Sequence, residues 1–164
     1  MAPAGLTLVL VREDLIGETL PGTPTMFDYK VMADNYSMYN TPPCWPIYMC
    51  KLVLEWIKND VGGLDKMKER NEKKAGVLYD FLDNSRFFKP CAEKDSRSIM
   101  NVTFITGDKD LDAKFVKEAA AAGFVNLKGH RSVGGMRASI YNAMPPEGVD
   151  KLVEFMREFE SRNG

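Results

Sequence analysis

The sequence predicts an α/β chain whose C-terminal part is a small α+β domain, with helices packed on a small, mostly antiparallel sheet. Apolar residues recur at helical spacing in several segments and alternate with polar residues in others, as in half-buried strands. Beyond residue 60 the order is helix, strand, helix, strand, strand, helix, which is typical of helices layered on one sheet. With 45% hydrophobic and 27% charged residues among 164, the chain has a globular composition.

The first expected element is a strand at Leu6–Val11, too short to span a bilayer and apolar on both faces. Such a strand is typical of a sheet covered by helices on each side, whose neighbours this chain need not contain; the alternative is a short N-terminal strand buried in a complete domain. Glycines and prolines then predict a loop-rich stretch to about residue 45. The run Ile47–Ile57 is apolar except for two charged residues, and it predicts a helix buried almost all round, with Trp45 and Trp56 as core anchors.

The Asp-Val-Gly-Gly sequence at residues 60–63 predicts the end of this helix and a boundary between residues 1–60 and residues 61–164. In the second part, each element follows from local apolar periodicity and from glycine or proline at its ends. The expected elements are a helix at 75–82, a strand at 100–105, a helix at 111–119, strands at 124–127 and 136–141, and a helix over 145–159.

Charge and cysteine content exclude several classes of function. The chain has 22 Lys and Arg against 23 Asp and Glu, so it lacks the basic excess typical of nucleic-acid binding. Its three cysteines form no CxxC pair, and it has one histidine, which argues against a disulfide scaffold and against a zinc site. We therefore expect no metal, no nucleic acid and no membrane partner, and a reducing, cytoplasmic location.

The densest polar cluster runs from Lys128 to Arg137. His130 and Arg131 lie on a glycine-rich turn, and alternation places Arg137 on the face of the next strand opposite its apolar residues. Three cationic groups on flexible backbone suit a carboxylate or phosphate, which arginine binds with a planar fork. The alternative is a solvated basic turn with a surface salt bridge.

A second polar motif is the segment Ser37–Pro43, which ends in two prolines just before the apolar helix. Proline is well suited to a first helical turn. Asn40 and Thr41 therefore stand where amide and hydroxyl groups either cap a helix N-terminus or meet an anion bound there.

Several of these segments occur together in one known family. The longest runs from Gly134 to Pro145 and continues at Glu147-Gly148-Val149; the others are Pro3–Thr7, Val11–Leu15, Ser37–Pro43, Asn101-Val102 and Gly129-His130-Arg131. On these stretches the chain resembles the phosphoserine aminotransferases, which are pyridoxal-phosphate enzymes of the aspartate-aminotransferase fold (fold type I, class V). The resemblance extends from residue 3 to the C-terminus.

The resemblance implies a C-terminal fragment of such an enzyme. Residues 1–60 then correspond to a remnant of the large, cofactor-binding domain, and residues 61–164 to the small domain. In the family the Schiff-base lysine lies a few residues before the Pro-Ala-Gly that is Pro3-Ala4-Gly5 here, so no catalytic residue is assigned to this chain. We expect the fragment to be inactive by itself and not to retain pyridoxal 5'-phosphate.

The resemblance also implies roles for individual residues. Asn40 and Thr41 match the pair that contacts the cofactor phosphate from the neighbouring subunit of a homodimer. Arg137 matches the arginine that holds the substrate α-carboxylate, and His130 and Arg131 match the pair that binds its distal anion. The implied reaction is amino transfer between glutamate and 3-phosphohydroxypyruvate, giving 2-oxoglutarate and phosphoserine, in serine biosynthesis.

Two other classes of function are consistent with the residues. One is a stand-alone anion-binding α+β module built on the second part of the chain, with His130, Arg131 and Arg137 in its pocket. The other is an assembly or interaction piece, in which the Leu6–Val11 strand and the Ile47–Ile57 helix seek a partner surface.

Overall fold

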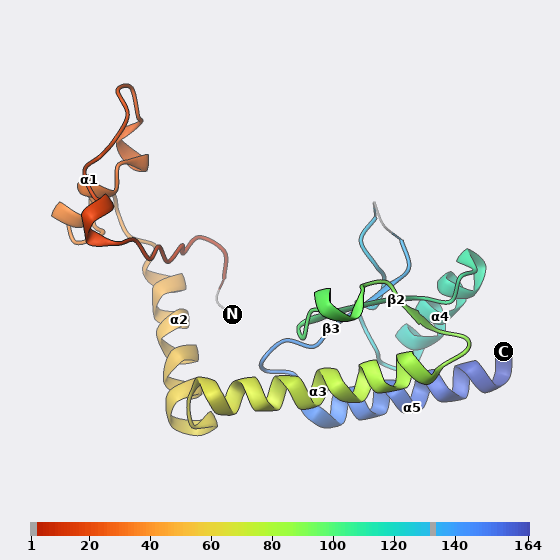
Figure 1. The fold of residues 1–164 in the computed structure, drawn as a ribbon. Helices are drawn as coiled ribbons and strands as arrows, with labels where there is room; N and C mark the ends of the chain where they lie inside the picture. Colours follow the sequence, from red (N-terminus) through yellow and green to blue (C-terminus); the bar gives the residue numbers. More distant parts are fainter. Residues whose placement is uncertain (1–2, 132–133) are drawn as a thin grey trace. The chain divides into compact units, whose positions relative to one another are not determined.

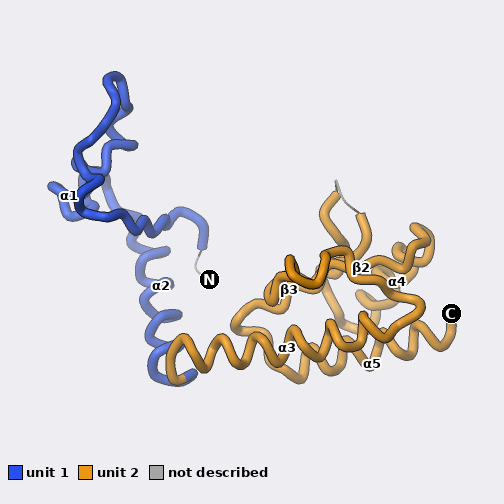
Figure 2. Tube along the Cα trace, in the orientation of Figure 1, with its two compact units in different colours: residues 1–61 blue, residues 62–164 orange. Residues whose placement is uncertain are grey.

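The structure is a computed structural model that describes residues 3–131 and 134–164. It divides into two compact units, residues 1–61 and 62–164, coloured separately in Figure 2. Short 3-10 helices occur at Glu13–Leu15, Thr25–Phe27 and Lys94–Ser96, and a short π-helix at Ile57–Val61. The helices and strands labelled in Figure 1 are α1 (Tyr29–Asp34), α2 (Cys44–Trp56), α3 (Leu64–Asn84), β1 (Lys89–Pro90), β2 (Asn101–Ile105), α4 (Lys109–Ala121), β3 (Met136–Ser139) and α5 (Pro146–Asn163).

The described part of the first unit contains helices and turns but no strand. The predicted strand at Leu6–Val11 is therefore wrong: Leu8 and Leu10 are exposed, and a strand forms only against a partner strand, which the described residues of this unit do not supply. Helix α1 lies within the stretch predicted as loop. It begins where the Asp28 carboxylate accepts a hydrogen bond from the Lys30 amide at 2.9 Å, a typical N-cap.

Helix α2 is the predicted apolar helix, but the prediction that it is buried almost all round is wrong in this chain. No residue of Cys44–Trp56 is buried. Trp45 is 63% exposed and Trp56 is half-buried, so neither anchors the core as predicted. Apolar residues lie on all sides of the helix, and the contacts within the first unit leave several of them exposed.

The second unit contains a three-stranded antiparallel sheet in the order β1-β2-β3, which confirms the predicted α+β class. Val102 and Phe104 of β2 are fully buried and alternate with half-buried neighbours, as the sequence predicts. The predicted strand at 124–127 is wrong. Asn126 has a φ of 62°, and a residue in this left-handed region interrupts extended backbone.

Helices α3 and α5 run side by side along the sheet (Figures 1 and 2). The predicted apolar faces of α3, α4 and α5 are confirmed, because their residues form one core with β2 and β3. These buried helical residues are Ala75, Leu78, Tyr79 and Leu82 of α3, Phe115 and Ala119 of α4, and Val149, Leu152, Val153, Met156 and Phe159 of α5.

One ion pair ties α3 to the loop before β2. The Arg97 guanidinium donates two hydrogen bonds to the Asp83 carboxylate, at 2.6 and 2.9 Å, and lies 4.5 Å from the centre of the Tyr79 ring. The Arg97 and Asp83 side chains are 13% and 27% exposed. The hydrogen bonds from Arg97 lower the pKa of Asp83, and the positive charges of Arg97 and Lys94 lower this pKa further.

We expect Asp83→Asn to reduce the free energy of unfolding by about 1 kcal/mol at pH 7, because it removes a bidentate ion pair near the surface. The pKa of Asp83 is lower in the folded chain than in the unfolded chain, so the stabilisation is present above the unfolded pKa and is lost as the pH falls through the folded pKa. Urea unfolding between pH 7 and pH 3 should therefore show the two proteins converging. Asp80→Asn, one turn earlier on α3, is the control; an equal effect there would contradict the assignment.

Candidate anion-binding site

The cationic cluster lies on a turn between α4 and β3 that backbone hydrogen bonds hold against β3. The Arg137 amide donates to the Leu127 carbonyl, and the Gly129 amide to the Gly135 carbonyl, both at 2.8 Å. A Cβ at Gly129 would overlap the Gly134 carbonyl oxygen, so only glycine allows the two sides of the turn to approach this closely. The Ser132-Val133 pair of this turn lies outside the described residues.

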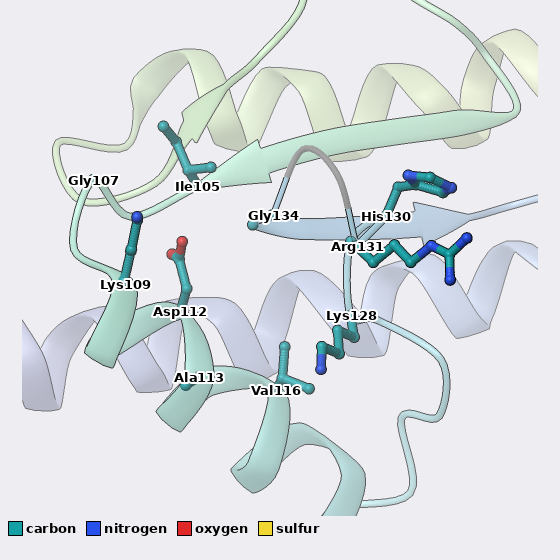
Figure 3. A pocket seen from close by; sticks show the side chains of 12 residues that line it. Ile105, Gly107, Lys109, Asp112, Ala113, Val116, Lys128, His130, Arg131 and Gly134 are labelled. Atoms are coloured by element: carbon teal, nitrogen blue, oxygen red, sulfur yellow. The ribbon is translucent and has the colours of Figure 1, made fainter.

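A cavity of about 640 Å³ lies between this turn and α4 (Figure 3). His130 and Arg131, both predicted to bind an anion, line it and are exposed. In Figure 3 their side chains lie next to each other and extend away from Lys109 and Asp112 of α4. His130 and Arg131, which the resemblance assigns to the distal anion of the substrate, thus lie on the same side of the turn.

Two further lysines line the same cavity, Lys128 before the glycine and Lys109 in the first turn of α4. Among the described residues of the lining, Asp112 is the acidic one, and its Oδ1 accepts hydrogen bonds from the Thr106 amide at 2.8 Å and from the Thr106 hydroxyl at 2.7 Å. The sequence offers no signal that marks Lys109, because it is far from the cluster along the chain and resembles an ordinary helix-surface lysine. The lining therefore carries an excess of positive charge.

Arg137 projects from β3, opposite Thr103 of β2, on the face that alternates with the buried Met136 and Ala138. This is the orientation predicted from the strand pattern. Its side chain is half-buried, and its Nε is buried without a hydrogen-bond partner in the described part of the chain. A buried guanidinium nitrogen of this kind is suited to an acceptor supplied by a ligand. Arg137 is not among the residues that line the cavity.

Asn40 and Thr41 lie in the first unit, shortly before α2. The alternative that they cap this helix is wrong, since its N-cap is Pro43 and, in the described residues, no side chain caps it. The Asn40 amide donates to the Thr41 carbonyl at 3.3 Å, and both residues are exposed. Their side chains are therefore accessible to an anion from outside the unit.

Helices on an antiparallel sheet, with an arginine on one strand and a cationic turn leading into it, define a domain suited to small anionic molecules. The family model of the class-V aminotransferases matches residues 1–152. This chain therefore belongs to the class-V aminotransferase family. The resemblance inferred from the sequence motifs is thereby confirmed.

The relatives and solved structures reported below are all named phosphoserine aminotransferases. The chain is 54% identical, over 99% of its length, to phosphoserine aminotransferase of Streptococcus agalactiae and 59% identical, over its whole length, to that of Laribacter hongkongensis. It covers 45% and 46% of these two proteins, in their C-terminal part. Among solved structures it matches phosphoserine aminotransferase from Bacillus circulans subsp. alkalophilus with a TM-score of 0.89 and 49% identity, over 94% of this chain and 43% of that one.

A second solved structure is a pyridoxal-phosphate-bound phosphoserine aminotransferase from Trichomonas vaginalis. It matches with a TM-score of 0.78 and 40% identity, over 84% of this chain and 39% of that one. Within residues 3–131 and 134–164, no helix combines the length and hydrophobicity needed to cross a membrane.

Proposed function

We propose that this chain forms part of a phosphoserine aminotransferase, which transfers an amino group between glutamate and 3-phosphohydroxypyruvate in serine biosynthesis. Residues 61–164 would form the small domain of that enzyme, and residues 1–60 a part of the large domain. The enzyme would be a cytoplasmic homodimer. The similarity to relatives of this name supports the proposal, over 99% of the chain but less than half of each relative.

The arrangement of the cationic residues carries the proposal. Glutamate and phosphoserine each have an anion at both ends, an α-carboxylate and a distal carboxylate or phosphate. The chain offers an arginine on a strand, Arg137, and a separate exposed pair, His130 and Arg131, on the turn that leads into that strand. We assign the α-carboxylate to Arg137, whose fork suits a carboxylate, and the distal anion to His130 and Arg131.

The residues of the first unit fit the cofactor phosphate. Asn40 and Thr41 are exposed and are not used to cap α2, so their side chains are available as hydrogen-bond donors to a phosphate. We propose that they contact the cofactor bound in the neighbouring subunit of the homodimer. Pyridoxal phosphate, when bound, supplies the electron sink for the reaction.

The chain has no lysine that we assign to covalent attachment of the cofactor. Among the described residues Lys74 is the buried lysine, at 1% exposure, and its ammonium group donates hydrogen bonds to three backbone carbonyls. We therefore expect the 164 residues alone, with pyridoxal phosphate, glutamate and 3-phosphohydroxypyruvate, to produce no phosphoserine and to lose the cofactor on gel filtration. Measurable turnover by the chain would contradict this.

A chimaera provides the positive test. Replacing the matching C-terminal part of the Streptococcus agalactiae enzyme with this chain should give a protein that forms phosphoserine from glutamate and 3-phosphohydroxypyruvate. A folded, cofactor-bound chimaera that transfers amino groups to other keto acids but not to 3-phosphohydroxypyruvate would overturn the proposed substrate.

A stand-alone anion-binding module is the second candidate, and one observation favours it. The cavity near His130 is formed entirely by residues of the second unit. Phosphoserine binding by the 164-residue chain alone, abolished by Arg131→Ala, would support this function; absence of binding would favour a site completed by other segments.

A further inference from the structure

Lys74 is a buried charge with an unusual environment. Its side chain is 1% exposed, and its Nζ donates hydrogen bonds to the carbonyls of Ile140 at 3.1 Å, Tyr141 at 2.7 Å and Met144 at 3.1 Å. Burial lowers the pKa of this ammonium group, and the neighbouring charge of Arg70 lowers it further. A buried ammonium is costly unless its donors are all satisfied, and here three carbonyls satisfy them.

The three carbonyls belong to one short segment, residues 140–144, which connects β3 to α5. A second contact joins the same segment to α3: the Asn71 side-chain amide donates to Asn142 Oδ1 at 2.8 Å. Asn71 and Lys74 are three residues apart and therefore lie on one face of the helix. Both residues are buried, so α3 contacts this segment through side chains that are themselves shielded from solvent.

The segment continues the strand that carries Arg137. Within β3, the Arg137 amide donates to the Leu127 carbonyl, and just after the strand the Ile140 amide donates to the Met100 carbonyl at 2.9 Å. Lys74 thus contacts the backbone three residues beyond Arg137, at the end of the strand away from the cationic turn. An apolar side chain in its place would leave three carbonyls without this donor and free the strand end to shift.

We propose that Lys74, assisted by Asn71, is a positioning residue for Arg137: it fixes the backbone after β3 and thereby the direction in which the guanidinium projects. This role rests on the proposed contact between Arg137 and the substrate carboxylate. It explains why a lysine, rather than an apolar residue, occupies a buried position on α3.

Hydrogen exchange and side-chain NMR of the 164-residue chain test the proposal with Lys74→Met. We expect the amides of Arg137 and Ile140 to exchange about tenfold faster, and the Arg137 Nε–H resonance to shift or broaden. The amide of Cys91, the residue after β1, donates to the Thr103 carbonyl of β2 and should change much less. Lys73→Met is the matched control, because Lys73 is the adjacent residue, is 74% exposed and pairs with Glu69.

A general loss of stability is separated from positioning by Leu82→Ala, a core change at the far end of α3. It should accelerate exchange throughout the second unit without moving the Arg137 Nε–H resonance. If Lys74→Met gives no more than this uniform acceleration, the positioning role is overturned. Should Lys74→Met fail to fold, Asn71→Ala, which removes one hydrogen bond, must show the same local pattern at smaller amplitude, and a uniform pattern again overturns the role.

No substrate enters these measurements. A negative result therefore removes the role of Lys74 and leaves the proposed substrate contacts of Arg137 standing. Conversely, a chimaera that fails to use 3-phosphohydroxypyruvate would not alter the exchange pattern expected from the hydrogen bonds between α3 and residues 140–144.

Discussion

Arg137→Ala in the chimaeric enzyme should lower kcat/KM for amino transfer from glutamate by about a hundredfold to a thousandfold. The guanidinium offers two parallel hydrogen bonds to a carboxylate, and loss of one partner of such a desolvated charge pair typically costs 2–5 kcal/mol. Arg137 already has a buried Nε without a partner among the described residues, so the substrate would satisfy a donor that the protein leaves open.

Two further variants distinguish loss of the carboxylate contact from loss of positive charge and from a general effect on the fold. Arg137→Lys keeps the charge but not the planar fork, so we expect it to recover only part of the activity. Arg86→Ala removes an exposed arginine after α3 and should leave kcat/KM nearly unchanged. If Arg137→Ala retained activity within threefold of the parent while folding normally, the assignment of the α-carboxylate to this residue would be wrong.

The second unit could be predicted from the sequence because its elements are patterned by their own core. Phe115 and Ala119, four residues apart on α4, are fully buried, as helical spacing requires. β1 could not be predicted, since it is two residues long and contains Pro90. The sequence predicts a strand at 124–127, where three of the four residues are apolar, but composition does not reveal the positive φ of Asn126.

The first unit could be predicted only in part, for a different physical reason. The apolar residues of Leu6–Val11 and α2 predict burial, but burial needs neighbours, which a pattern in one segment does not specify. In this chain Leu10 is fully exposed and Leu54 is 54% exposed. The apolar groove lined by residues of both segments, including Leu6 and Ile47, shows that these two segments of the first unit face one another.

Within the candidate site, the placement of the cationic groups on the turn and on β3 could be predicted, and the residues that hold the backbone beside them could not. His130, Arg131 and Arg137 are marked in the sequence by the glycines around them. Lys74 follows Lys73 in a helix rich in charge, so the sequence gives no sign that one side chain is exposed and the other buried. Its role depends on carbonyls more than 60 residues away, and a lysine has the same preference for a helix in either environment.

Phe88→Ala should produce the largest loss of stability, about 4 kcal/mol in the free energy of unfolding of the second unit. Phe88 is fully buried and its ring is the centre of an aromatic cluster. The centroid of the Phe88 ring lies 5.2 Å from that of Phe115 and 5.8 Å from that of Phe104, both in edge-to-face geometry. The variant therefore loses apolar burial and favourable ring contacts together. Urea unfolding followed by circular dichroism measures the change.

The size of this effect follows from where Phe88 lies. It stands just before β1 and also contacts rings of α3 and α5, Phe81 and Phe159, so the cavity is bordered by several elements that cannot all move inward. Val125→Ala is a control within the second unit, since Val125 is 71% exposed and its truncation should cost less than about 0.5 kcal/mol. Equal losses for the two variants would show that the aromatic cluster does not carry the stability of the second unit.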